Sequence, residues 1–106
     1  MSELEELRQR LRAFAAERDW EQFHTPKNLA MALVAEAGEV VEHFQWLTAA
    51  ESGALTPEQR AEVALELADV LLYLVMLADR LGVDLGDAAH RKIILNEKRF
   101  PRPPRP

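Results

Sequence analysis

The sequence predicts an all-α protein whose helices form a four-helix bundle. Apolar residues recur at helical spacing in four segments, and each segment is bounded by capping residues, proline or glycine. No segment shows the alternation of apolar and polar residues, closed by a hairpin turn, that is typical of antiparallel strands. Four helices joined by short connections favour antiparallel packing around one core.

The first two predicted helices each begin at a capping residue. Ser2 opens a capping-box pattern, and the apolar residues after it recur at helical spacing to about Arg18. Thr25 is followed by a proline, which suits the first position of a helix. This second helix is predicted to run to about Leu47, and the segment "TAAESGAL" that follows is expected to form a loop.

The last two predicted helices have equally clear ends. Thr56 and the proline after it begin the third helix, which continues to about Leu81, where Gly82 supplies a left-handed stop. Asp84 can cap the fourth helix, which must end before Pro101 because proline disfavours helical geometry in the residue ahead of it. The third helix is apolar nearly all round, so it needs burial on more than one side and we expect an oligomer.

The 106 residues suffice for a single domain, which we assign to residues 1–100. Residues 101–106, "PRPPRP", are expected to be a disordered tail. The longest apolar run is far shorter than the ~20 residues that a bilayer requires, and the N-terminus lacks the apolar region of a signal peptide. We therefore predict a cytoplasmic protein without membrane partners. The absence of cysteine excludes disulfides and Cys-ligated zinc.

Charge is distributed unevenly along the chain. Residues 1–90 hold seven Lys and Arg against seventeen Asp and Glu, whereas residues 91–106 hold six against one. The acidic main part is a poor match for a nucleic-acid backbone, while the basic end could meet phosphate groups. The sequence therefore predicts a small anionic ligand and no nucleic-acid polymer as partner.

Two pairs of acidic residues interrupt the most apolar helices. Glu36 and Glu39 are three residues apart on the second helix, and Glu66 and Asp69 are three apart on the third, so each pair shares a helix face. Both pairs border the apolar arcs that should face the bundle interior. Burying unpaired carboxylates costs several kcal/mol by rough estimate, so a cation is needed to compensate them.

Three interpretations of these pairs compete. They could be solvated, with the helices rotated slightly from the phase assigned here. They could form a di-iron carboxylate centre, but such centres usually need Glu-x-x-His, and His43 stands four residues after Glu39. They could form a site for a hard cation, Mg²⁺ or Mn²⁺, bound together with substrate phosphates. We favour the third interpretation because the ligands offered are oxygen atoms alone.

The acidic motifs, "EAGE" and "ELAD", resemble the signature of the MazG-like all-α nucleoside triphosphate pyrophosphohydrolases. Three longer segments are similar to the dCTP pyrophosphatase branch of that superfamily, and together they cover nearly the whole chain: "FAAERDWEQFHTPKNLAMALVAEAGEVVEHFQW", "ELADVLLYLVMLADRLGVDL" and "RKIILNEKRFP". The resemblance implies a MazG-like bundle and hydrolysis of a nucleoside triphosphate between its α and β phosphates.

The resemblance also implies roles for the acidic residues. Glu36, Glu39, Glu66 and Asp69 are implied metal ligands, which would hold Mg²⁺, with Mn²⁺ as the alternative ion, against the triphosphate. A bound Mg²⁺ neutralises phosphate charge and lowers the pKa of a bound water, and a carboxylate can accept that water's proton. Glu39 is the residue that we assign to this catalytic role. Glu42, one turn further on, is expected to be an ordinary exposed residue.

Five further residues are candidates for binding the substrate. Lys92 and Asn96 share a face of the fourth helix, and the resemblance places them at the phosphates and sugar. Trp20 and Trp46 stand where the dCTP branch lines its nucleoside pocket. Tyr73 lies one turn after the aspartate of "ELAD", so its ring should border the acidic face.

One position departs from the pattern of the branch. Some members use a histidine of the first helix near the substrate, whereas Leu11 and Arg12 stand there in this chain, so the departure bears on the base preference and not on the hydrolysis. His24 is expected to mark a helix entry and not to act in catalysis.

Taken together, the sequence predicts a Mg²⁺-dependent enzyme that converts deoxynucleoside triphosphates to the monophosphate and pyrophosphate. Its leading substrates are dCTP and modified dCTP, and its expected role is cleansing of the nucleotide pool. Members of the family assemble as dimers or dimers of dimers, so a homodimer or homotetramer is implied. The alternative is a non-catalytic helical module that binds nucleotide or metal, or mediates interactions.

Overall fold

The computed structural model describes residues 2–104, which form helices joined by short turns and contain no strand. The helices, in chain order, are α1 (Glu3–Glu17), the 3₁₀-helix η1 (Glu21–Phe23), α2 (Pro26–Glu42), α3 (Ala49–Ser52), α4 (Pro57–Leu81) and α5 (Leu85–Arg99). The predicted all-α class is therefore confirmed. Residues 101–104 carry no regular secondary structure, and the end of the predicted tail, residues 105–106, lies outside the described residues.

The four predicted helices correspond to α1, α2, α4 and α5, and each begins at the cap that the sequence indicated. The side chains of Ser2, Thr25, Thr56 and Asp84 each accept a hydrogen bond from the backbone amide three residues later. Gly82 ends α4 at φ 68°, in the left-handed region that favours glycine. Local capping chemistry thus determines most of the helix boundaries.

Two boundaries differ from the prediction. Helix α2 ends at Glu42 and not near Leu47, because the chain tightens into turns in which the amides of Phe44 and Leu47 bond to carbonyls three residues earlier. The predicted loop contains the short helix α3, which begins with a complete capping box between Thr48 and Glu51. The 3₁₀-helix η1 was also not predicted.

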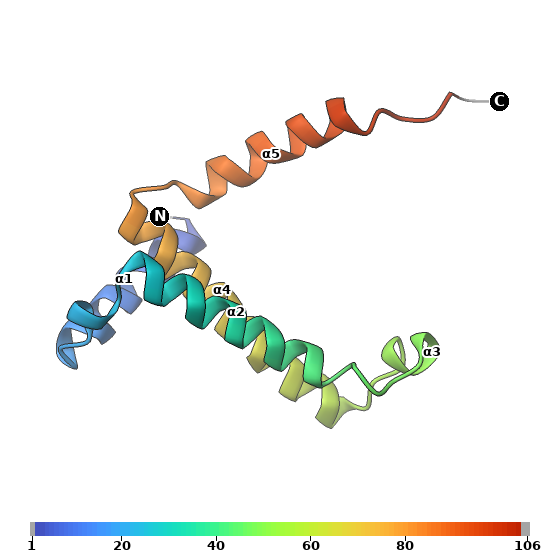
Figure 1. Cartoon of the computed structure of the whole chain (residues 1–106), viewed down its shortest axis with the longest axis horizontal. Coiled ribbons are helices and arrows are strands. Elements are labelled where there is room, and N and C mark those ends of the chain that lie inside the picture. The colour runs from blue at the N-terminus through green and yellow to red at the C-terminus, as the bar shows by residue number, and fades with distance from the viewer. Residues whose placement is uncertain (1, 105–106) are drawn as a thin grey trace.

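Helices α2 and α4 lie side by side and antiparallel, and they form the centre of the molecule (Figure 1). Helix α1 packs against the C-terminal part of α4, and α3 lies at the opposite end of the α2–α4 pair (Figure 1). The buried apolar side chains join α1, α2 and α4: Ala15, Leu29, Val63, Val75 and Ala78. None of the helices in residues 2–104 is long and apolar enough to cross a bilayer.

Helix α5 leaves the other three long helices and makes only sparse contacts with them (Figure 1). The accessible surface is 8538 Å², against roughly 6,000 Å² for a compact folded monomer of this size. The radius of gyration is 17.3 Å, against roughly 13 Å for a compact domain of this length. The chain thus supplies all four helices of the bundle but does not close it by itself, and completion by oligomerisation stays a prediction.

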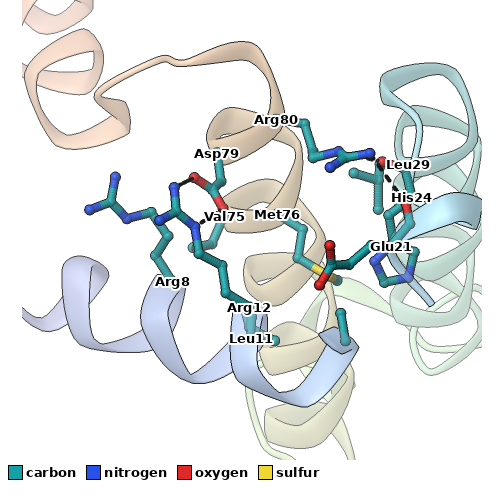
Figure 2. A pocket seen from close by; sticks show the side chains of 11 residues that line it. Arg8, Leu11, Arg12, Glu21, His24, Leu29, Val75, Met76, Asp79 and Arg80 are labelled. Carbon is teal, nitrogen blue, oxygen red and sulfur yellow. Dashed lines mark hydrogen bonds and ion pairs between the residues drawn. The ribbon is translucent and has the colours of Figure 1, made fainter. Parts of the chain in front are cut away.

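An ion pair joins α1 to α4. The Nε atom of Arg12 donates to Oδ2 of Asp79 at 2.8 Å, and its Nη2 atom contacts the other carboxylate oxygen (Figure 2). This hydrogen bonding, opposed in part by burial of the carboxyl, holds the pKa of Asp79 below its ordinary value. The pair is bidentate, so it fixes the orientation of α1 as well as its distance from α4.

Replacing Arg12 by Gln is expected to move acid unfolding to higher pH. The lowered pKa of Asp79 contributes stability that is present above the pKa of its unfolded state, near 3.8, and is lost as pH falls through the folded value. Without Arg12 the largest part of this contribution is lost, so the variant should unfold at a higher pH than the parent. Circular dichroism during acid titration measures the midpoint, and an unchanged midpoint would contradict the role given to this pair.

Candidate functional site

The antiparallel packing of α2 and α4 brings the two acidic pairs together. Glu36 and Glu39 face Glu66 and Asp69 across the helix pair, and one carboxylate oxygen from each of the four residues lies within 4.8 Å of the others. Spacing of three residues keeps each pair on one helix face, and the antiparallel arrangement places those two faces opposite each other. The predicted cluster is therefore present within a single chain.

Burial and mutual repulsion make this cluster electrostatically unfavourable without a cation. Glu36 is half-buried, and burial, followed by the charges of Glu39 and Asp69, raises its pKa. The pKa of Glu66 is also raised, first by hydrogen bonding with Glu39, then by burial and the same charges, while His43 lowers it. The carboxyl groups of Glu36 and Glu66 therefore bind a proton more tightly than an exposed carboxyl group does.

The side chains present fit a divalent hard cation. Among residues 2–104, the Oε2 atoms of Glu36 and Glu66 are buried without a hydrogen-bond partner, which is unfavourable for a carboxylate oxygen unless another group satisfies it. Glu39 and Asp69 are exposed and leave the cluster open to solvent on one side. An all-oxygen donor set with an open side suits Mg²⁺, which retains water and substrate oxygens among its ligands.

A cavity of about 400 Å³ adjoins the acidic cluster, and we call it the aromatic cavity. Asp69 belongs to both the cluster and the cavity wall, and Trp20 and Tyr73 line the same space. Residues of α1 and α4, together with His24 immediately after η1, complete the wall: Leu7, Arg10, Leu11, Phe14, Ala15, Leu72 and Met76. The structure thus brings two of the three predicted aromatic residues beside the acids, in a space of the size that small-molecule sites occupy.

Three predicted substrate-binding residues lie away from this cavity. Trp46 follows α2 on the side of α3, and 87% of its surface is exposed. Lys92 is exposed on α5, and Asn96 is half-buried on the same helix. None of the three lines the aromatic cavity. Because α5 leads away from the other long helices, one chain alone does not bring Lys92 and Asn96 to the acids (Figure 1). The roles of all three residues stay predictions.

The cavity also contains residues that sequence reasoning did not assign to a site. Phe14 and Trp20 meet edge to face, with ring centroids 5.5 Å apart, and the ring of His24 lies 6.3 Å from that of Trp20. Phe14 shares a face of α1 with Leu7 and Leu11, so the sequence does show that this helix has an apolar face. The same spacing is expected for a face that packs in the core and for one that lines a cavity, so it did not identify Phe14 as a site residue. Nothing in the sequence distinguished His24 from a helix-entry residue.

Comparisons with known proteins agree with this geometry. A model of the MazG-like family matches residues 31–105. The chain is 53% identical over 100 residues to dCTP pyrophosphatase 1 of Rattus norvegicus and 52% identical to that of Homo sapiens, with 92% of the chain covered in both cases. The chain spans 59% of the length of each of these relatives.

A solved structure gives the same result for the fold. The crystal structure of a pyrophosphatase from Archaeoglobus fulgidus superposes with a TM-score of 0.90 at 38% sequence identity, covering 96% of this chain and 95% of that one. The resemblance drawn from the "EAGE" and "ELAD" motifs is therefore confirmed. On its family match, its relatives and its fold, the chain belongs to the MazG-like family.

Proposed function

We propose that this protein is a metal-dependent nucleotide pyrophosphohydrolase that converts deoxynucleoside triphosphates to the monophosphate and pyrophosphate. The observation that carries the proposal is the convergence of four carboxylates from α2 and α4 beside the aromatic cavity. The names of the relatives, dCTP pyrophosphatase 1, support dCTP and modified forms of dCTP as the preferred substrates. The proposed role is cleansing of the nucleotide pool in the cytoplasm.

In the proposed site, Glu36, Glu39, Glu66 and Asp69 hold Mg²⁺, with Mn²⁺ as the alternative ion. A bound ion would supply positive charge for the triphosphate and lower the pKa of a coordinated water. Glu39 is exposed, so its carboxylate can reach a water on the open side of the cluster and accept a proton from it. No covalent nucleophile is required from the chain.

The aromatic cavity is the proposed place of the nucleoside. Trp20 and Tyr73 supply flat surfaces on which a base or sugar can pack, and apolar side chains between them exclude water. Since Asp69 lies in the wall shared with the acidic cluster, a nucleoside in this cavity has its phosphates directed toward the carboxylates. Binding in this orientation would hold the reacting phosphates in place.

We further propose that a second copy of the chain completes the site in a homodimer or homotetramer. Helix α5 carries Lys92 and Asn96 away from the acids of its own chain, and it leaves Ile93, Ile94 and Leu95 each more than half exposed. The excess of accessible surface over that of a compact monomer, about 2,500 Å², is of the size that stable subunit interfaces bury. Lys92 and Asn96 would then bind the phosphates and sugar at a neighbouring chain's acids.

The alternative function is a non-catalytic helical module that binds nucleotide or metal. The complete acidic set disfavours it. Four converging carboxylates destabilise the free protein, and replacement of any one of them would relieve the repulsion. A module without catalysis would have little to gain from retaining all four.

A substrate panel tests the proposal. The purified protein is incubated with dCTP, 5-methyl-dCTP, dTTP, dATP or dGTP in Mg²⁺, in Mn²⁺ or in EDTA. Pyrophosphate and the monophosphate should appear in equal amounts, fastest from the two cytosine nucleotides and not in EDTA. Release of orthophosphate and the diphosphate would contradict the proposed bond cleavage. Binding without hydrolysis of any nucleotide would favour the non-catalytic module.

A further inference from the structure

The segment between α1 and α2 supplies one side of the aromatic cavity. It contains η1, with Trp20 immediately before it and His24 immediately after it. Trp20 and His24 both line the cavity, and Asp69 and Tyr73, which line it as well, belong to α4. The width of the cavity therefore depends on how this segment, which we call the η1 turn (residues 20–24), is held relative to α4.

Arg80, in the last turn of α4, holds the η1 turn by its backbone. Its Nε atom donates to the carbonyl oxygen of His24 at 2.8 Å, and its Nη2 atom donates to the carbonyl oxygen of Glu21 at 3.2 Å (Figure 2). Within residues 2–104, these are the hydrogen bonds that join the η1 turn to α4. They link positions 56 and 59 residues apart in the sequence.

The other bonds of the η1 turn are local and do not fix its distance from α4. The amide of Trp20 donates to the carbonyl of Ala15 at 2.9 Å, which closes the end of α1, where Asp19 adopts φ 56°. Nδ2 of Asn28 donates to the carbonyl of Phe23 at 3.0 Å, which joins the turn to the start of α2. These bonds shape the turn, whereas Arg80 attaches it to the helix that carries Glu66, Asp69 and Tyr73.

The chemistry of arginine suits this role. A planar guanidinium presents several N–H donors at fixed angles, so one side chain can bond two carbonyls at once, and its charge strengthens both bonds. Asp79, its neighbour in the chain, is bonded to Arg12. Arg80 does not line the aromatic cavity. It lines a neighbouring cavity of about 430 Å³, whose wall also includes Glu21 and His24 (Figure 2), so its link to the proposed nucleoside site runs through the η1 turn.

We propose that Arg80 is a positioning residue that clamps the η1 turn to α4 and so holds Trp20 and His24 in place as a wall of the nucleoside site. Its contribution to catalysis rests on the proposed function, whereas the clamp itself does not. Because Arg80 touches neither the acids nor the proposed place of the phosphates, its loss should weaken nucleotide binding more than it slows the chemical step.

The test compares Arg80→Ala and Arg80→Lys with Arg60→Ala, a control that removes an exposed arginine from the same helix far from the cavity. For the fluorescence measurement alone, the parent and each variant also carry Trp46→Phe, so that Trp20 is the sole tryptophan; KM and kcat are measured with Trp46 in place. Acrylamide quenching of Trp20 fluorescence measures how well the ring is held. The KM and kcat for dCTP in Mg²⁺ measure binding and turnover, and thermal unfolding followed by circular dichroism measures the fold.

Arg80→Ala is expected to increase quenching of Trp20 by about twofold and to raise KM by about tenfold or more, as loss of a fixed binding wall should, while kcat changes less than threefold. Arg80→Lys should restore part of both effects, since an ammonium can donate to one of the two carbonyls. Arg60→Ala should match the parent. Should Arg80→Ala fail to fold, Arg80→Gln keeps an N–H donor without charge and takes its place.

Two results would overturn the proposal. Unchanged quenching and unchanged KM in Arg80→Ala would show that the η1 turn is held without Arg80. A fall in kcat at constant KM would show that Arg80 acts on the reacting phosphates. If the parent protein hydrolyses no nucleotide, the proposed function fails, but the quenching of Trp20 in parent and variant still decides whether the clamp exists.

Discussion

Replacing Glu39 by Gln is expected to lower kcat for dCTP hydrolysis by at least about a hundredfold, the contribution typical of a positioned general base. The substitution removes a proposed metal ligand and the proposed proton acceptor but keeps the length and shape of the side chain. Glu39 is exposed, so the new amide can be hydrated and leaves no buried polar group unsatisfied. Pyrophosphate release under saturating dCTP and Mg²⁺ measures the loss.

The same variant should be at least as stable as the parent. The charge of Glu39 raises the pKa values of Glu36 and Glu66, so removing it relieves repulsion within the cluster. In EDTA the melting temperature should therefore stay equal or rise. Added Mg²⁺ should raise the melting temperature of the variant less than that of the parent, because a ligand stabilises the folded state more when it binds that state more tightly.

Glu42→Gln is the matched control, since it makes the same chemical change one turn along α2 at an exposed residue outside the cluster. It should retain parental activity and the parental response to Mg²⁺. Full activity in Glu39→Gln, with Mg²⁺ still required, would show that this carboxylate neither holds the metal nor activates water. An equal loss in both variants would indicate that general charge on α2, and not the cluster, controls the reaction.

Much of the fold was predictable because it is determined locally. Thr25, Thr56 and Asp84 cap helix starts with their side chains, so each start is encoded by residues next to it in the sequence. Gly82 marks a helix end that requires positive φ. The acidic cluster was predictable for a related reason. Spacing of three residues fixes each pair on a helix face, and burial of apolar neighbours turns those faces toward each other.

Features that depend on contacts between distant segments were not predictable. Arg80 bonds carbonyl oxygens, which every residue carries, so no pattern of side chains marks its partners. The direction of α5 after Gly82 depends on what its apolar side chains pack against, and a single chain offers them little (Figure 1). The placement of Lys92 relative to the acids therefore could not follow from helix periodicity. That of Trp46 could not either, because α2 ends at Glu42, before the chain reaches Trp46.

Replacing Ile93 and Ile94 together by Glu is expected to dissociate the proposed oligomer and to lower activity by more than about tenfold. Each of these side chains is 55% exposed on α5, and burial of that remaining area in an interface would stabilise each by about 1–1.5 kcal/mol. Two carboxylates in an apolar interface would instead be strongly unfavourable. Analytical ultracentrifugation measures the assembly, and Lys98→Glu on the same helix controls for the change of charge.

Mixing two inactive variants then tests whether the site is shared between chains. Chains with Glu39→Gln have intact α5 helices, and chains with Lys92→Ala have intact acids, so an oligomer containing both kinds has some sites in which every residue is parental. If α5 acts on a neighbouring chain, unfolding and refolding equal amounts of the two variants together should restore about a quarter of parental activity, because about half of the pairs are mixed and each mixed pair contains one complete site of two. A mixture no more active than its components would show that each chain uses its own α5, which would have to fold back over the acids from the position it occupies here (Figure 1).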